Sequence, residues 1–233
     1  MKENSCMDMQ LIFNYLSELS ENNNREWYHL HKEEQKEANA QFEALLQTLI
    51  LDIGKTDYSF IGVVPLELTF KLVRDTRFSH DKSPYNPAFR AHISSKGKLP
   101  VPVGYYIMLK PGNQSFLGGG LFADVFKDAT TMVRDYLIEN PDEWNQIIHA
   151  PDFQTYFTVK GTSLKNVPRG YDKEHPMAEY LKLKSWYLEY SLEDQELLDA
   201  ELFIEKSVKI FEAMQPFNDY LNRALEKFQM PSR

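Results

Sequence analysis

The residues best suited to chemistry lie in one short segment, residues 71–85, with the sequence KLVRDTRFSHDKSPY. Its two arginines stand three residues apart, and each guanidinium can bind both oxygens of a phosphate or carboxylate. Two such groups at this spacing can converge on one anion. The segment therefore predicts a site for a small anionic ligand, in which Tyr85 adds a hydrogen bond and the anion is held by Lys71, Arg74, Arg77 and Lys82.

The carboxylates of the same segment leave two interpretations open. Asp75 and Asp81 can orient the arginines around a ligand, or one of them can act as a general base if the protein catalyses a reaction. Alternating Arg and Asp residues also form structural salt-bridge networks that fix a loop. The distinction depends on whether Arg74 and Arg77 are exposed to a ligand or buried among acidic partners, because a buried arginine needs paired acceptors.

Other residues suited to chemistry give weaker signals. His175, three residues after Asp172, is a further candidate catalytic residue, with a cap-and-turn role as the alternative. The run Gly118–Gly120 lacks the following Lys-Ser/Thr of a nucleotide-binding loop, so a bulge or tight turn is favoured over an anion cradle. None of the six histidines forms a metal motif, and the single cysteine, Cys6, excludes an internal disulfide. No metal site is therefore predicted and no cofactor-binding residue is identified, while the identity of any cofactor is left open.

The basic residues are concentrated in one part of an acidic chain. The 233 residues contain 26 Lys and Arg against 34 Asp and Glu, for a net charge of −8. Residues 69–113 hold eight basic and two acidic side chains, a local charge of +6, which leaves −14 for the rest. This asymmetry indicates either a localised anion-binding patch or a basic segment that docks against acidic neighbours in the same chain. The overall negative charge makes nucleic-acid binding the least favoured function.

The elements that must position this segment follow from the hydrophobic periodicity. Residues 8–53 predict two N-terminal helices, the first capped by Asp8 and the second, longer one running from about Asn24 to Ile53. Residues 199–229 predict C-terminal helices that are kinked or split at Pro216.

The chain between these ends, residues 66–190, is predicted to contain the sheet. Alternating apolar residues indicate strands at 68–72, 89–95, 105–110, 115–120, 153–159 and 186–190. Helical spacing indicates a helix over residues 124–139, and shorter helices are expected after Pro141 and Pro176. The sequence thus predicts one α+β domain over residues 1–233, with a mainly antiparallel or mixed sheet and helices at both ends.

Several of these motifs resemble one known family. The stretch 74–79 (RDTRFS) with 81–85 (DKSPY) is similar to the signature of the bacterial domain of unknown function family 2461, and further similarity lies at residues 21–27, 118–122 and 167–176. Lys71 stands where that family usually has arginine, and His80 and Asn86 stand where it often has lysine. These differences reduce the positive charge of the segment. The resemblance implies a single intracellular domain of bacterial type, marks where a site lies, and names no reaction.

These observations favour one function and leave an alternative. The first ten residues lack the apolar region of a secretory signal, and no apolar stretch is long enough to span a membrane, so a cytoplasmic location without membrane contact is expected. The favoured function is binding of a small phosphorylated or carboxylated ligand, with the question of enzyme activity open. The alternative is a non-enzymatic protein-interaction module in which the Arg/Asp segment is structural and an exposed apolar stripe over residues 204–228 meets the partner.

Overall fold

A computed structural model of the chain describes residues 7–122, 124 and 126–231. Its centre is an antiparallel sheet of four strands in the order β1-β2-β3-β4. The strands are β1 Phe89–Ile93, β2 Tyr105–Leu109, β3 Ser115–Leu121 and β4 Trp186–Leu192. Each lies within two residues of a strand predicted from alternation. The predicted α+β single-domain class is confirmed, while Cys6 and Val125 lie outside the described residues.

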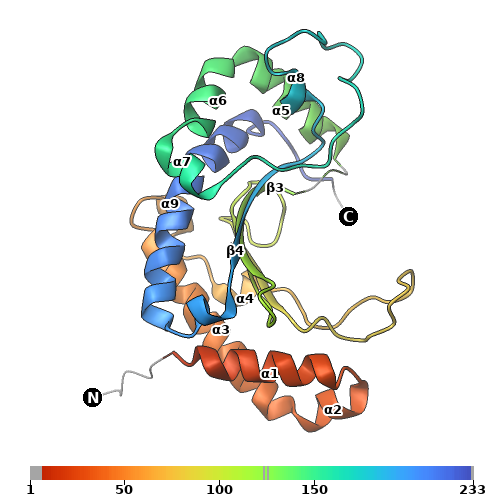
Figure 1. Cartoon of the computed structure of the whole chain (residues 1–233), viewed down its shortest axis with the longest axis vertical. Helices are drawn as coiled ribbons and strands as arrows, with labels where there is room; N and C mark the ends of the chain where they lie inside the picture. The colour runs from red at the N-terminus through yellow and green to blue at the C-terminus, as the bar shows by residue number, and fades with distance from the viewer. Residues whose placement is uncertain (1–6, 123, 125, 232–233) are drawn as a thin grey trace.

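Helices pack along one side of this sheet and at both of its ends (Figure 1). The N-terminal helices are α1 Met9–Glu21, α2 Arg25–Leu30, α3 Lys32–Ile53 and the short α4 Pro65–Leu68, with the 3₁₀ turn η1 Tyr58–Phe60 between the last two. The later helices are α5 Lys127–Glu139, α6 Pro141–Ile148, α7 Pro151–Tyr156, α8 Ala178–Leu181, the 3₁₀ turn η2 Asp194–Leu197 and α9 Ala200–Ala224. Asp8 caps α1 as predicted, because its carboxylate accepts a hydrogen bond from the Leu11 backbone N–H at 2.9 Å.

The core lies between the sheet and α9. On β2, Tyr105 packs against Phe211 of α9 with 4.7 Å between ring centroids. On β3, a Cβ built on Gly119 would lie 3.0 Å from the Met214 Sδ atom of α9, so a larger residue would require that side chain to shift. The predicted bulge or tight turn at Gly118–Gly120 is therefore wrong, since these glycines lie within β3.

Two predicted strands are helical or irregular instead. Residues 68–72 contain the end of α4 followed by a segment with two isolated bridges, Thr69 to Ala91 and Val73 to Tyr85. Residues 153–159 contain most of α7. In both places a proline, Pro65 or Pro151, occupies the first helical turn, where its fixed φ favours a helix.

One prediction for the long helices is wrong, and one of the two alternatives for the other is excluded. The second N-terminal helix is divided into α2 and α3 at His31, whose ring stacks on Trp27 at 4.1 Å between centroids. The C-terminal helix is not split at Pro216, because α9 continues through it. Pro216 is exposed, so the carbonyl that loses its N–H donor there is available to water. No helix in the described part of the chain is long and apolar enough to cross a membrane.

Candidate functional site

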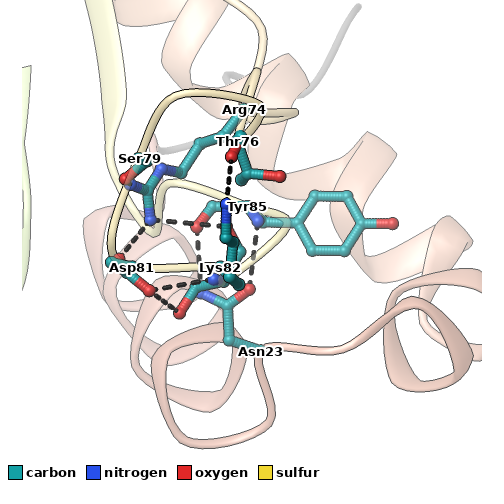
Figure 2. Close-up of polar contacts among 8 residues, drawn as sticks. Asn23, Arg74, Thr76, Ser79, Asp81, Lys82 and Tyr85 are labelled. Atoms are coloured by element: carbon teal, nitrogen blue, oxygen red, sulfur yellow. Dashed lines mark hydrogen bonds and ion pairs between the residues drawn. The ribbon is translucent and has the colours of Figure 1, made fainter.

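The predicted site segment forms an arm, residues 71–86, that extends from the sheet on the side away from α9 (Figure 1, gold). Its two ends are joined by the bridge between Val73 and Tyr85. Asn23, from the turn after α1, fixes this base by donating to the Tyr85 carbonyl at 2.9 Å and accepting from the Tyr85 N–H at 3.1 Å (Figure 2). The Tyr85 ring stacks on Tyr28 of α2 at 3.9 Å between centroids. Tyr85 therefore anchors the arm to the N-terminal helices.

Arg74 holds the two halves of the arm together. Its guanidinium pairs with Asp81 and donates to the Ser79 Oγ and the Ser83 carbonyl, both at 3.3 Å. Asp81 also accepts hydrogen bonds from the Ser83 side chain and backbone, at 2.6 and 2.9 Å. These Ser83 contacts, followed by the contact with Arg74, hold the pKa of Asp81 well below its usual range. Figure 2 shows Arg74 directed toward Ser79 and Asp81, within the arm.

The other two cations of the arm are also held by it. Arg77 donates to both oxygens of Asp75, with 2.6 Å for the Nη2 contact, and this hydrogen bond lowers the pKa of Asp75. Lys82 donates to the Thr76 carbonyl at 3.0 Å (Figure 2). At the tip, the Phe78 side chain is 95% exposed, with the Arg77 guanidinium 5.9 Å from its ring centroid. The arm is thus an internally braced loop that presents an aromatic ring to solvent.

The remaining predicted residues are placed apart from these. Lys71 is exposed at the base of the arm, and its side chain makes no ion pair in the residues described. His175 and Asp172 lie in the loop before α8, and α8 lies toward the opposite end of the molecule from the arm (Figure 1). There the His175 Nδ1 accepts from the Met177 N–H at 3.1 Å, and Asp172 accepts from the Glu174 N–H at 3.0 Å. These are local turn contacts of the kind weighed as the alternative for this pair.

The sheet face opposite α9 carries a row of residues paired across all four strands. Register places His92, Tyr106, Gly118 and Glu189 opposite one another across β1, β2, β3 and β4. Residues alternate between faces along a strand, and Tyr105 faces α9, so this row faces the other way. A Cβ on Gly118 would lie 3.1 Å from the Phe122 ring, so the glycine leaves room for that ring over the row.

Two adjoining cavities lie here, the first on this face and the second at the edge of the sheet beside β1, between α3 and residues 66–73. The first has a volume of about 310 Å³ and is walled mainly by aromatic rings, Phe70, Tyr106, Phe116 and Phe122. His92, Lys98 and Glu189 supply its polar groups. The second has about 300 Å³, reaches the base of the arm, and is lined by Lys71, Val73 and Tyr28 among others. Phe70 and Lys98 line both cavities, so the two meet at these residues.

Positive charge gathers where the cavities meet. The Lys98 Nζ donates to the Thr69 carbonyl at 2.8 Å, and the Arg90 Nη2 donates to the Lys71 carbonyl at 3.2 Å. The Arg90 guanidinium also lies 5.6 Å from the centroid of the Phe70 ring, and its buried Nε has no hydrogen-bond partner in the described chain. Unlike Arg74 and Arg77, the three cations Lys71, Arg90 and Lys98 have no carboxylate partner among the residues placed by the structure.

Burial determines the pKa values of two titratable groups in the first cavity. His92 is 6% exposed, and burial lowers its pKa to about 4, so its imidazole is neutral near pH 7. Burial raises the pKa of the Tyr106 hydroxyl, which Arg90 partly opposes. Glu189 pairs with Lys160 at 2.9 Å. The cavity therefore offers a neutral imidazole and a neutral phenol beside unpaired cations.

Sequence reasoning missed His92 and Tyr106 as residues of a site. Both lie on predicted strands, but neither belongs to a sequence motif that points to a ligand. The signal available was their position on predicted strands, and only the register of β1 with β2 places them side by side.

Comparison with known proteins gives one result. A search of curated proteins and a search of solved structures found no significant match. The family model described as conserved hypothetical protein (DUF2461) matches residues 11–220, which include the arm, the sheet and most of α9. The match extends over most of the 233 residues. The chain therefore belongs to this family of conserved hypothetical proteins, DUF2461.

Proposed function

We propose that this chain binds a small ligand that combines a planar ring with an anionic group, phosphate or carboxylate, where the two cavities meet. The observation that carries the proposal is a set of three cations without a carboxylate partner in the described residues. Lys98 lines both cavities, Lys71 lines the second, and Arg90 lies against the ring of Phe70, which lines both. A cation next to a cavity and unneutralised by the protein attracts an anion from solution.

The aromatic walls of the first cavity favour a ligand with a planar ring. Tyr106 lies 5.6 Å from Phe116 and 5.7 Å from Phe122, measured between ring centroids, and Phe70 lies 6.2 Å away. These rings form a platform on which a flat ligand gains apolar contact and stacking. A volume of about 310 Å³ is at the lower end for small-molecule sites and accommodates a small ring system with a substituent.

In this proposal most cations of the arm have a structural role, whereas the sequence predicted that they bind the anion. Arg74, Arg77 and Lys82 are engaged within the arm, so they brace it, and Lys71 at its base is the arm residue that meets the ligand. The anion site thus uses the same basic segment, residues 69–113, but mainly its later residues.

Isothermal titration calorimetry with matched probes tests the proposal. The panel contains a nucleoside monophosphate and an aromatic carboxylate, together with the free nucleoside and inorganic phosphate as the separate halves. A hydrogen bond to a charged group contributes about 1.5–3 kcal/mol, so Lys98→Ala is expected to weaken binding roughly tenfold or more. Lys96→Ala is the matched control, because Lys96 is exposed in the same loop and lines neither cavity.

The outcomes separate the proposal from its alternative. Binding of a complete probe, weaker binding of either half, and a loss specific to Lys98→Ala would support it. If no probe binds, or if Lys98→Ala and Lys96→Ala behave alike, the site is not an anion site. The interaction-module alternative would then lead, with its surface at Phe78 on the arm, because the apolar stripe over residues 204–228 that it required is mostly buried in the core.

A further inference from the structure

The second cavity, beside β1, differs from the first in the chemistry of its walls. Aromatic rings form most of the first cavity, whereas many side chains of the second carry a polar group, namely Tyr28, Gln35, Asn39, Thr69, Lys71 and Lys98. None of the described residues that line it is acidic. Its volume of about 300 Å³ is close to that of the first, so it can hold a second unit of the ligand. The proposed function gives a role to its cations but none to its uncharged polar groups.

Two of these uncharged groups are amides on one face of α3. Gln35 and Asn39 lie one helical turn apart, and both are half-buried. The Gln35 side chain makes no hydrogen bond to the part of the chain that the structure describes. Asn39 donates from Nδ2 to Glu43 at 2.5 Å, and its Oδ1 has no donor there. A primary amide both donates and accepts, which matches a hydroxyl group. The pair therefore suits a neutral unit that carries several hydroxyls.

The cations at the junction of the cavities suit an anion with more than one phosphate. The Lys98 Nζ donates to the Thr69 carbonyl and the Arg90 Nη2 donates to the Lys71 carbonyl, so both cations lie along residues 69–71. Lys71 itself reaches only the second cavity. The positive charge thus extends from one cavity to the other. A diphosphate, with an ionised oxygen on each phosphorus, can contact more of these cations than a single phosphate can.

We propose that the ligand is a nucleoside diphosphate sugar, an inference that rests on the proposed function and names its substrate class. The base lies among the rings of the first cavity, and the diphosphate contacts the cations at the junction. The sugar occupies the second cavity, where its hydroxyls exchange hydrogen bonds with Gln35 and Asn39. Tyr28 and Val73 supply apolar wall for its C–H groups. The order of ring, anion and hydroxylated unit follows the order of the walls.

Titration calorimetry of the full chain with two matched series tests this assignment. One series is UMP, UDP and UDP-glucose, and the other is AMP, ADP and ADP-glucose, so a preference for either base does not decide the result. The double variant Gln35→Ala/Asn39→Ala is expected to bind the nucleotide sugar roughly tenfold more weakly, because the hydrogen bonds to the sugar are lost. Its affinity for the nucleoside diphosphate should not change. Alanine favours the helix at both positions, so the variant will fold. Gln47→Ala is the matched control, because Gln47 is exposed further along α3 and lines neither cavity.

The outcomes distinguish this inference from the proposed function. Weaker binding of the sugar alone, in the double variant and not in Gln47→Ala, would support it. An equal loss for the nucleoside diphosphate and its sugar, or no loss for either, would overturn it, and so would binding of no nucleotide in either series. In those cases the proposed function would still stand if a nucleoside monophosphate or an aromatic carboxylate bound and Lys98→Ala weakened that binding. If Lys98→Ala had no effect either, both would fail.

Discussion

His92 on β1 is expected to make the stability of this protein fall steeply in mild acid. Its imidazole is 6% exposed beneath the loop that joins β1 to β2, with the backbone of Gly97 and Leu99 beside it. Burial lowers its pKa to about 4, whereas the same group in the unfolded chain has a pKa of about 6.5. Between these values the unfolded state binds a proton that the folded state does not. The free energy of unfolding must therefore decrease as the pH falls through this window.

The size of the effect follows from the two pKa values. A difference of about 2.5 pKa units corresponds to about 3 kcal/mol when the pH has fallen below both values. Most of this decrease in the free energy of unfolding occurs before the pH has fallen to the folded-state pKa. Between pH 7 and pH 5 the linkage relation gives a decrease of about 2 kcal/mol. For a chain of this length about 2 kcal/mol corresponds to a decrease of roughly 4–8 °C in thermal midpoint.

The perturbation is His92→Gln, which keeps a hydrogen-bonding side chain and removes the titration. Urea unfolding, followed by tryptophan fluorescence at pH 7 and pH 5, gives the free energy of unfolding of each protein at each pH. The wild type is expected to lose about 2 kcal/mol more than the variant between these conditions. The control is His29→Gln, which removes an exposed imidazole on α2 and should follow the wild type. Parallel pH dependence in wild type and His92→Gln would refute the argument, as would an NMR titration that protonates His92 near pH 6.5.

Three further substitutions test close packing and buried polar groups elsewhere in the fold. Gly119→Ala should lower stability by about 1–3 kcal/mol, because the new Cβ would lie 3.0 Å from the Met214 Sδ; an unchanged thermal midpoint would contradict this contact. Arg134→Met should lower the free energy of unfolding in urea by about 2–4 kcal/mol, because the buried guanidinium donates to two carbonyls around the end of α8 at 2.8 and 2.7 Å. An unchanged free energy of unfolding would mean that water replaces the guanidinium. Tyr15→Phe should leave stability unchanged or raise it by up to about 1 kcal/mol, and a clear loss would show that the hydroxyl has a partner.

Local sequence determined most of the secondary structure. The Asp8 cap and the four strands follow from side-chain type and alternation over a few residues, and the structure confirms them. Residues 68–72 and 153–159 were predicted wrongly because three or four alternating apolar residues fit a helical turn almost as well as a strand. The prolines at 65 and 151 were the deciding local signal, since both open a helical turn.

The structure of the arm is also determined by residues that are close together in the sequence. The partners of Asp75 and Asp81 lie between two and seven residues away in the sequence, so the segment itself contains what braces it. Its charge pattern predicted an anion site in this segment, yet it did not distinguish the cations that pair within the arm from those that stay unpaired. That difference depends on which side chains the fold brings within reach of each carboxylate.

The proposed sites were decided by tertiary structure alone. Phe70, Tyr106 and Glu189 come from distant parts of the chain and meet only because the antiparallel register aligns β1 through β4 and α9 covers the opposite face. Sequence fixes which residues can form helices, strands and local ion pairs, since those depend on near neighbours. A cavity, an unpaired charge or a buried hydroxyl depends on distant neighbours, which packing alone determines.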